Sequence, residues 1–381
     1  MSLNHSPQVV TNGLVFYYDM SNTKKSFKGK PVTNLALDTN YSSRTYYTAY
    51  PASSWGGDSA EVYFYPSGGY DGLPYKRMLK TAAGTGGSYL DGHYSFTLVE
   101  GTTYTVSCYM RANTNVTVSG HTLALNRWAD NGYRVPADIN LTPTWTRQSW
   151  LYTCGVGEGG TTYGLRQIVY NDDLLPLEIF WCGLQVEEGS FATPFVNGTR
   201  SNTQALLDLT GNTTTDVTNV GYDSVGKPEF ATAGKIITTS YVPTSPISTL
   251  EAMIYPTALG TYKCIIQTSD ANDAAFYLAP TGYLFWYPYG SAGSLIPPLN
   301  QWSYVAAVWN GNNYFFQLNG TYIQGGGATA PTYTFARIGA GAVNDSEGFI
   351  GKIDVVRIYN RALTQVELKQ NFNALRGRFG I

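Results

Sequence analysis

Charged residues are scarce in this sequence. Asp, Glu, Lys and Arg make up 13% of its 381 residues, against about 25% in a typical soluble protein. The formal net charge is −2, and Lys and Arg never form a run. Proteins that follow a nucleic-acid backbone carry a basic stripe that meets the phosphates. We therefore expect no nucleic acid among the partners of this protein.

Long apolar runs are also missing. No stretch approaches the roughly 20 apolar residues that a membrane-spanning helix needs. The first residues, MSLNHSPQVV, have neither the basic region nor the apolar core of a secretory signal. We expect no membrane insertion and no export by a cleaved leader, so the chain is expected to fold in a cytoplasm.

Cysteine is rare as well, with four residues: Cys108, Cys154, Cys182 and Cys264. No pair has C-x-x-C spacing, and three of the four fall in the strand-like segments YTVSCYM, WLYTCG and EIFWCG. We expect reduced thiols that are buried as small hydrophobic side chains. A zinc site or a disulfide framework is the alternative.

Catalytic motifs are missing too. The sequence has no G-x-S-x-G, P-loop or H-E-x-x-H pattern. It also has no E-x-D-x-x-E strand, which places the two carboxylates of a glycoside hydrolase in one cleft. The nearest acidic pair, Glu187 and Glu188, is adjacent in a strand-like segment, so its side chains point to opposite faces. His5, His93 and His121 are scattered and are expected in loops or on the surface. We predict no enzymatic activity, no catalytic residue and no cofactor.

Tyrosine and glycine are abundant, with 31 and 41 residues. Tyr and Thr favour strands, and Gly and Asn favour turns. Strand-like segments recur at short intervals between turn pairs, which is typical of β-sandwiches. Asn319-Gly320 predicts a tight hairpin. The clearest strand-like segments are Leu14–Tyr18, Thr103–Met110, Trp145–Thr153, Leu177–Glu187, Thr249–Tyr255, Tyr304–Trp309, Tyr314–Leu318 and Gly351–Tyr359.

One helix is predicted near the end of the chain. Thr364 and Glu367 are spaced as a capping box, which marks a helix N-terminus. Gly377 offers a stop, so we place the helix at about Gln365–Leu375. Its apolar face is expected to hold Leu363, Val366, Phe372 and Leu375.

The C-terminal segment has a recognisable pattern. Gly351–Tyr359 reads GKIDVVRIY, and Asn360–Thr364 reads NRALT. This order of a strand, N-R-A-L-[ST] and a short helix resembles the end of concanavalin A-like (laminin-G-like) jelly rolls. The ending NFNALRGRFGI is similar to versions carried by structural proteins of tailed bacteriophages. The resemblance implies a β-sandwich fold and a phage origin.

The opening motifs of the same family are present but far apart. Gly13–Asp19 resembles its first strand, G-L-V-x-x-x-D, and Leu207–Asn212 resembles the D-L-[ST]-G-N turn that soon follows it in the family. An inserted domain explains the separation, because insertion at a loop is tolerated when the ends of the insert lie close together. We expect residues 1–33 and 200–381 to form one sandwich, with residues 34–199 as the insert.

The insert has a resemblance of its own. Glu100–Ala112, Thr142–Thr153 and Phe180–Val196 follow one another as in carbohydrate-binding jelly rolls that occur in phage tail and minor structural proteins. The expected fold class is therefore all-β, with two jelly-roll sandwiches, the second nested in the first, and one short C-terminal helix.

Two clusters of aromatic residues are candidates for a functional surface. Exposed rings stack on sugars, but tyrosines also fill sandwich cores and subunit interfaces, so sugar binding, an interface and core packing all remain open. The candidates are Trp55, Tyr63, Tyr65, Tyr283, Trp286, Tyr287 and Tyr289. The tryptophans expected in the core are Trp128, Trp145, Trp150, Trp181, Trp302 and Trp309.

Two acidic loops could hold a structural calcium ion, as jelly rolls often do. One contains Asp270 and Asp273, and the other contains Asp345 and Glu347. Their carboxylates are ligands of the kind that calcium prefers. Asp and Asn also cap ordinary turns, which is the alternative.

These features favour a virion surface protein of a bacteriophage: a head-decoration, fibre or tail-associated subunit that is assembled in the host cytoplasm and adheres to other virion proteins. A glycan-binding adhesin for host attachment is the alternative, and a glycoside hydrolase is a third. Low charge and many tyrosines suit a homo-oligomer. The terminal Phe379 and Ile381 either pack on their own sandwich or anchor a neighbouring subunit.

Overall fold

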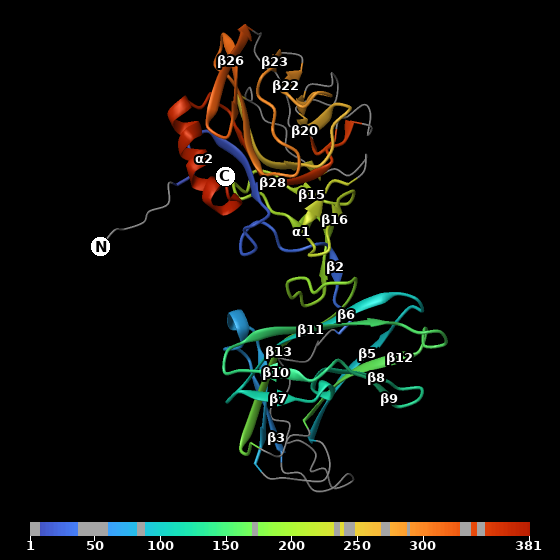
Figure 1. The fold of residues 1–381 in the computed structure, drawn as a ribbon. Helices are drawn as coiled ribbons and strands as arrows, with labels where there is room; N and C mark the ends of the chain where they lie inside the picture. Colours follow the sequence, from blue (N-terminus) through green and yellow to red (C-terminus); the bar gives the residue numbers. More distant parts are fainter. Residues whose placement is uncertain are drawn as a thin grey trace, which may run out of the picture. The chain divides into compact units, whose positions relative to one another are not determined.

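The computed structural model describes residues 8–36, 60–81, 88–169, 174–231, 237–239, 248–267, 275–287, 290–327, 337–340 and 347–381. Within them the chain is mostly β-strand, with antiparallel sheets and a C-terminal helix. It divides into two compact units (Figure 1). We call Met1–Pro31 with Ser201–Ile381 the split unit, and Val32–Arg200 the continuous unit.

Two sheets form the split unit. The six-stranded sheet has the order β1 (Leu14–Asp19), β28 (Gly351–Tyr359), β19 (Thr249–Pro256), β24 (Ser303–Trp309), β25 (Asn313–Leu318) and β26 (Thr321–Gly327). The seven-stranded sheet has the order β15 (Thr215–Asp216), β18 (Ile237–Thr239), β27 (Arg337–Ile338), β20 (Lys263–Gln267), β21 (Ala275–Leu278), β22 (Leu284–Tyr287) and β23 (Gly290–Ala292). The unit also holds β16 (Gly221–Tyr222), β17 (Pro228–Glu229), α1 (Asn202–Ala205) and α2 (Gln365–Phe379).

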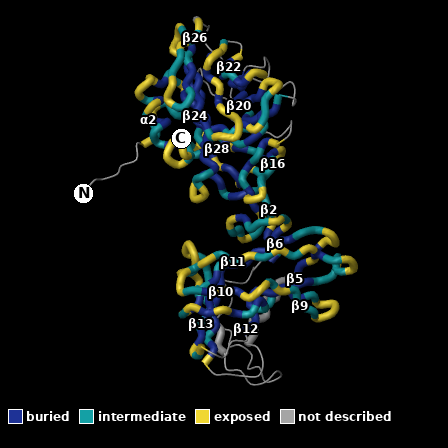
Figure 2. Tube along the Cα trace, viewed as in Figure 1, coloured by how far each residue is buried: buried dark blue, intermediate teal, exposed yellow. Residues whose placement is uncertain are grey.

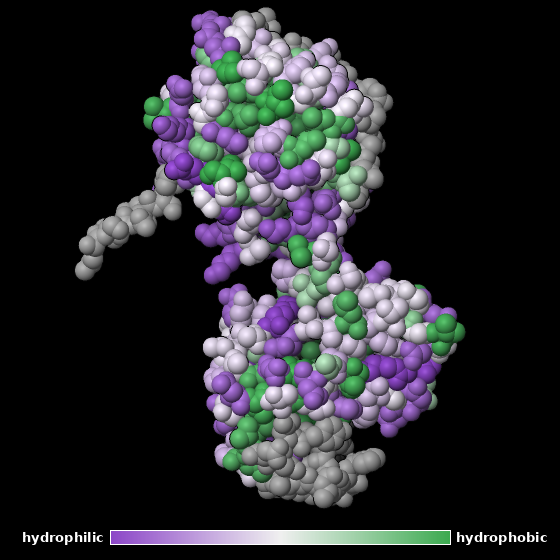
Figure 3. Space-filling view, in the orientation of Figure 1, coloured by the Kyte–Doolittle hydropathy of each residue, from purple (hydrophilic) through white to green (hydrophobic). Residues whose placement is uncertain are grey.

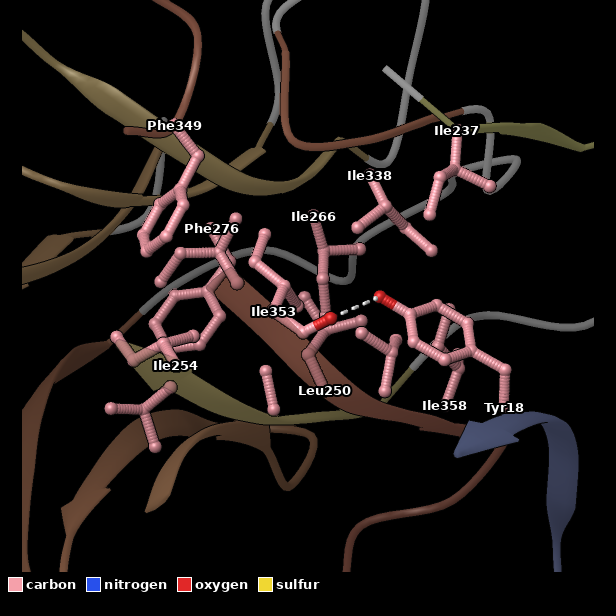
Figure 4. Packing of buried hydrophobic residues seen from close by; sticks show 14 of the residues in the cluster. Tyr18, Ile237, Leu250, Ile254, Ile266, Phe276, Ile338, Phe349, Ile353 and Ile358 are labelled. Carbon is pink, nitrogen blue, oxygen red and sulfur yellow. Dashed lines mark hydrogen bonds between the residues drawn. The ribbon is translucent and has the colours of Figure 1, made fainter. Parts of the chain in front are cut away.

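The core of the split unit lies between these two sheets (Figure 4). Leu250 and Ile358 contribute from the six-stranded sheet, and Ile266 and Phe276 contribute from the seven-stranded sheet; all four are fully buried. Because successive strand residues point to opposite faces, only alternate side chains reach this core. The hairpin expected at Asn319-Gly320 is confirmed, since it joins β25 and β26 and both residues have positive φ.

Strand β1 belongs to the six-stranded sheet, where it pairs antiparallel with β28. The turn that contains Asp208 covers its other edge. Asp208 Oδ1 accepts a hydrogen bond from Tyr17 N (2.9 Å), and Leu209 N donates to Tyr17 O (2.7 Å). The two motifs that lie far apart in the sequence therefore meet in space, and neither edge of β1 stays open to pair with another chain.

Helix α2 begins as the sequence predicts but ends later. Thr364 and Glu367 form the capping box, and the helix continues to Phe379, where Gly380 caps it with φ 71°. The predicted stop at Gly377 was wrong, because residues beyond it make tertiary contacts that keep the chain helical. Val366 is 77% exposed, so its predicted place on the apolar face was also wrong. The buried positions are Leu363, Leu368, Phe372 and Leu375.

The terminal residues pack on their own unit. The rings of Phe379 and Trp302 have centroids 4.8 Å apart, and Ile381 lies against the same apolar cluster. Arg378 Nη1 lies 2.7 Å from Asp19 Oδ2. Of the two expectations for Phe379 and Ile381, internal packing is therefore the one observed. Trp302, expected in the core, is partly buried in this cluster under α2.

Three sheets and a short ribbon form the continuous unit. The five-stranded sheet has the order β11 (Thr146–Thr153), β6 (Thr103–Ala112), β13 (Leu177–Glu188), β4 (Tyr75–Lys80) and β3 (Ala60–Tyr65). The four-stranded sheet has the order β5 (Ser88–Thr97), β12 (Thr162–Val169), β8 (Ala124–Arg127) and β9 (Gly132–Arg134). The remaining pairs are β10 (Ile139–Leu141) with β7 (Val116–Val118), and β14 (Thr199–Arg200) with β2 (Val32–Thr33). Two 3₁₀ turns, η1 (Tyr70–Gly72) and η2 (Gly120–Leu123), complete the unit.

The continuous unit has its own core, and Figure 2 shows the buried strands of each unit in dark blue. Cys108, Cys154, Cys182 and Cys264 are all free thiols in buried positions, which confirms that expectation. Burial raises the pKa of Cys182 to about 11, so this thiol stays protonated at neutral pH.

The ends of the continuous unit lie side by side. Val32 pairs with Arg200, and Thr33 pairs with Thr199. Asn34 then ties the ribbon to β13: its Nδ2 donates to Leu184 O (3.0 Å), and its Oδ1 accepts from Val186 N (3.0 Å). The chain therefore enters and leaves this unit through one two-stranded ribbon.

Among the described residues, the helices are too short or too polar to cross a membrane.

Candidate functional site

The outer face of the five-stranded sheet carries a row of alternating aromatic and arginine side chains. Arg111 on β6 is paired with Phe180 on β13, which is paired with Arg77 on β4, which is paired with Tyr63 on β3. Trp145, directly before β11, extends the row beyond Arg111. We call these five residues the ladder. They point away from the core because Ile179, Trp181, Met110 and Met78, next to them in sequence, point into it.

The side chains of the ladder contact one another through their rings and guanidinium groups. The Arg111 guanidinium lies 3.7 Å from the ring centroid of Phe180 and 5.3 Å from that of Trp145. The Arg77 guanidinium lies 5.2 Å from the Tyr63 ring. The rings of Trp145 and Phe180 meet edge to face at 6.4 Å. These contacts are cation–π and aromatic pairs, and they hold long side chains in one position.

A second row runs beside the ladder. Arg147 is paired with Tyr109, and Tyr75 is paired with Tyr65. The rings of Tyr65 and Tyr75 are stacked at 4.4 Å, and Tyr70 from η1 is stacked on Tyr109 at 3.9 Å. The Arg147 guanidinium lies 4.8 Å from the Tyr109 ring. The two rows together form a broad aromatic and cationic surface.

The three arginines differ in their electrostatic partners. Arg77 Nε lies 2.7 Å from Glu178 Oε2, and this hydrogen bond raises the pKa of Arg77. Arg147 Nη2 donates to Ser107 Oγ (2.8 Å). Within the described ranges, Arg111 has ring contacts but no hydrogen bond or ion pair. One of the three charges is therefore neutralised and two are not.

The ladder is accessible from one side. Phe180 is 6% exposed and forms its floor, while Tyr63, Trp145 and Arg111 are half-buried. Figure 3 shows hydrophobic side chains gathered around β13 on the visible face of the continuous unit. A flat ligand that lies on this face would meet ring surfaces and guanidinium N–H groups together.

The predicted aromatics of the continuous unit divide into three groups. Tyr63 and Tyr65 lie together on the outer face, and Trp55 lies outside the described residues. Trp145, expected in the core, is on the outer face instead. Trp128, also expected in the core, is 50% exposed beyond the end of β8. Trp150 and Trp181 do contribute to the core, as expected.

Arg111, Trp145, Tyr75 and Tyr109 were not among the predicted site residues. The sequence does hold a signal for two of them. In TYTVSCYMRA the core residues Val106, Cys108 and Met110 alternate with Tyr109 and Arg111, so a period of two separates them. The aromatic partners of Arg111 come from β11 and β13, and only strand pairing reveals them.

The aromatic cluster of the split unit is divided between two faces. Trp286 is fully buried in the sandwich core, so its prediction as a surface candidate was wrong. Its neighbour Tyr287 points to the opposite face and is 43% exposed. Tyr283 is half-buried, and Tyr289 lies outside the described residues. Trp309 packs against the core, as expected.

A smaller aromatic strip surrounds Tyr287 on the outer face of the seven-stranded sheet. Phe285 lies 6.0 Å from Tyr287 and 5.9 Å from Tyr262, and Tyr262 lies 5.7 Å from Tyr277. Tyr262 is 37% exposed and Tyr277 is 2% exposed. The strip contains no stacked arginine among the described contacts, so it offers ring surface without fixed donors.

A pair of buried carboxylates in the split unit serves the fold. Asp19 and Asp354 are 3% and 5% exposed. Ser21 N donates to Asp19 Oδ1 (3.0 Å) and to Asp354 Oδ1 (3.2 Å), and Arg378 binds Asp19. Burial, and then the nearby charge of Asp19, raise the pKa of Asp354. Asp19 and Asp354, from the first and last strands, thus fix the turn after β1 through Ser21 and the end of α2 through Arg378.

Glu187 also serves the fold. It is fully buried, and its Oε1 accepts hydrogen bonds from Thr193 N (2.8 Å) and Gln185 Nε2 (2.6 Å). Glu188, the next residue, is exposed. The two carboxylates therefore lie on opposite faces of β13, as the sequence predicts.

Most of the predicted calcium ligands lie in parts of the chain that the structure does not describe. Asp270, Asp273 and Asp345 lie outside the described residues, and Glu347 is half-buried. In the described part of the chain, no group of three or more His, Cys, Asp or Glu side chains is placed to hold a metal ion.

Comparison with known proteins identifies one domain. Residues 231–369 match the model of the concanavalin A-like lectin/glucanases superfamily. The chain therefore carries a concanavalin A-like, laminin-G-like domain in its split unit, as the closing motif predicted. A search of curated proteins finds no match.

Several solved structures are similar at low identity. Domain 4 of AbnA, an arabinanase from Geobacillus stearothermophilus, in complex with arabinotriose, is 18% identical, with 46% of this chain and 93% of that chain covered and a TM-score of 0.36. The CBM22-1 xylan-binding domain of Xyn10C from Paenibacillus barcinonensis is 10% identical, with 42% and 95% covered and a TM-score of 0.27. The sialidase of Trypanosoma rangeli with sialic acid is 10% identical, with 82% and 53% covered and a TM-score of 0.39.

Proposed function

We propose that this protein binds glycans and that the ladder is the binding face. The observation that carries the proposal is the alternation of Trp145, Arg111, Phe180, Arg77 and Tyr63 across one half-exposed sheet face. Sugar rings stack on aromatic faces, and guanidinium groups donate hydrogen bonds in a fixed plane. The concanavalin A-like domain lies in the other unit; its superfamily includes lectins, which supports glycan binding by the chain and not the choice of the ladder.

The test is a titration of the full chain on a glycan array, followed by calorimetry with any glycan that binds. Trp145→Ala should weaken binding at least about 10-fold, since stacked rings contribute on the order of 1–3 kcal/mol. Trp128→Ala is the matched control, because Trp128 is exposed in the same unit but follows the other sheet. Equal losses from both variants, or binding that survives Trp145→Ala, would contradict the proposal.

We also propose that the continuous unit is a jelly roll inserted into the concanavalin A-like sandwich. The domain bounds expected from the sequence, 1–33, 34–199 and 200–381, stay a prediction. The paired ends Val32 and Arg200 support it, since replacing the unit with a short turn would leave β1 its partner β28. The chain with residues 32–200 replaced by such a turn should fold cooperatively. Failure of that chain to fold would count against insertion.

The virion role remains a prediction. It rests on the ending that resembles phage structural proteins, and the structure gives Phe372, Arg378 and Phe379 of that ending internal contacts. A homo-oligomer on a particle, bound to other virion proteins, is the arrangement to test. Immunogold labelling of intact particles and mass measurement in solution check it. A monomer that is absent from purified particles would end this assignment and leave the adhesin proposal standing.

We also propose that the protein binds its glycan without hydrolysing it. Incubation of the protein with the glycan it binds should release no new reducing ends. Release that disappears in Asp354→Asn would instead make the buried carboxylate pair catalytic.

A further inference from the structure

The two rows of the binding face carry an excess of positive charge. They contain Arg77, Arg111 and Arg147, and no acidic residue occupies a position in either row. Glu178, two residues from Phe180 on β13 and on the same face, pairs with Arg77. The whole chain has a net charge of −2, so these two rows do not follow the overall charge of the sequence.

Arg111 is held with its donors unused. Its guanidinium is 3.7 Å from the Phe180 ring centroid and 5.3 Å from that of Trp145. At 3.7 Å from Phe180 the guanidinium is at stacking distance, and a stacked arginine keeps in-plane donors for other partners. No described residue accepts a hydrogen bond from these donors. Arg111 is thus positioned before any ligand arrives, which reduces the entropy lost on binding.

Arg147 adds a second positive charge in the second row, but its unused donors are buried. One nitrogen, Nη2, donates to Ser107 Oγ (2.8 Å), and the guanidinium lies over the Tyr109 ring. Its Nε and Nη1 are buried and have no hydrogen-bond partner in the described structure. Arg147 is paired with Tyr109, which lies two residues before Arg111 on β6. Arg147 is therefore the diagonal cross-strand neighbour of Arg111, with a backbone separation of roughly 7–8 Å.

We propose that the ligand of this face is a glycan whose sugars carry carboxylates, and that Arg111 binds a carboxylate while Trp145 stacks on the sugar ring. This rests on the proposed function and specifies its substrate class. A uronic acid presents a ring face and a carboxylate at the ring edge, which match a stacked ring and an in-plane guanidinium. A neutral glycan would leave both charges uncompensated.

The test compares glycans in matched pairs that differ only in charge. Polygalacturonate is measured against its methyl ester, and alginate and hyaluronan against their carboxyl-reduced forms, by calorimetry with the full chain. At least one acidic member should bind at least about 10-fold more tightly than its neutral partner. Its affinity should fall between 50 and 500 mM NaCl, because exposed charge interactions are screened.

Two variants then assign the effect to Arg111. Arg111→Gln should weaken binding of the acidic glycan about 10- to 100-fold, as loss of a charge-assisted bidentate pair does, and Arg111→Lys should restore part of it. Arg376→Gln is the control, since Arg376 also lies over a ring, that of Phe372, but in the split unit. The fold of each variant is checked by circular dichroism.

The outcomes separate the two proposals. Neutral members that bind as tightly as acidic ones, with Trp145→Ala weakening both, would overturn the acidic ligand and keep glycan binding. Binding of dextran sulfate or of single-stranded poly(dT), with no uronic acid bound, would overturn the carboxylate assignment. No binding by any member of the panel would overturn the acidic ligand, and a blank glycan array as well would overturn both.

Discussion

Both units place an arginine on an aromatic ring on the outer face of a sheet, but with different surroundings. In the split unit, Arg357 lies 5.8 Å from the Tyr17 ring and its Nε lies 2.9 Å from Glu251 Oε2, with both charges buried. Helix α2 covers this face, and its Asn371 donates to both Glu251 oxygens (2.9 and 3.1 Å). In the continuous unit, Arg111 lies on Phe180, and it has no ion pair among the described residues.

The difference shows what distinguishes a structural arginine from a binding one. A buried charge needs a paired charge. Glu251 supplies it for Arg357, and Tyr304 and Asn371 donate hydrogen bonds to Glu251. A half-exposed guanidinium is stable in water without an acid, so its donors remain available. An arginine placed on an aromatic ring therefore stabilises the fold in the split unit, whereas in the continuous unit it can bind a ligand.

The largest expected effect is on the buried pair. Glu251→Gln leaves the Arg357 charge buried without its partner and should destabilise the split unit by about 3–5 kcal/mol. Hydrogen exchange of peptides from β19 reports this change, with peptides from β6 as the internal reference. Replacing both residues together, as Glu251→Met with Arg357→Leu, should recover most of the loss. If Glu251→Gln lowers the free energy of unfolding by less than about 1 kcal/mol, Arg357 does not depend on its ion pair, and the contrast with Arg111 fails.

A smaller loss of stability is expected where Asn371 of α2 contacts the buried Glu251–Arg357 pair. Asn371→Ala removes its bonds to Glu251 and the bond that its Oδ1 accepts from Val10 N (2.8 Å), which should cost about 1–3 kcal/mol. Asn373→Ala, two residues along the same helix, is the matched control and should change stability by less than about 0.5 kcal/mol. Chemical unfolding followed by circular dichroism measures both.

The start of α2 should be sensitive to acid. Hydrogen bonds from Arg361 and from Thr364 lower the pKa of Glu367 from its usual 4.5 to about 2. A lowered carboxylate pKa stabilises the fold above pH 4.5, and the contribution is lost as pH falls through about 2. Glu367→Gln should lose at most about 1 kcal/mol at pH 7, and the loss should shrink steadily toward pH 2, measured by thermal unfolding across this range. A pH-independent difference would show that the charge is unimportant.

The smallest effect on stability is expected on the ladder. Arg111→Gln should change the free energy of unfolding by no more than about 0.5 kcal/mol, as substitutions of half-exposed residues without ion pairs usually do, even though ligand affinity is expected to fall. Chemical unfolding of the variant next to Glu251→Gln completes the comparison. A loss of several kcal/mol would place Arg111 with Arg357 among the structural arginines.

Much of the strand pattern was predictable. The eight strand-like segments, the Asn319-Gly320 hairpin and the capping box at Thr364 all appear, with bounds that differ by a few residues. The place of β1 in the sandwich of residues 200–381 followed from motifs far apart in the sequence, but its partner strand β28 did not. Each of these features depends on local propensity or on a pattern that neighbouring residues carry.

The sequence by itself determined where strands, turns and the helix start, because backbone preferences act over a few residues. It also determined that Trp286 and Tyr287 face opposite sides, since strands alternate with a period of two. Only the tertiary structure decided which side is the core, as Trp286 is buried and Tyr287 exposed. It likewise decided that α2 passes Gly377 and that Arg111 meets Phe180 and Trp145. Those outcomes depend on packing between segments distant in the chain, and no local pattern records which partner a side chain will meet.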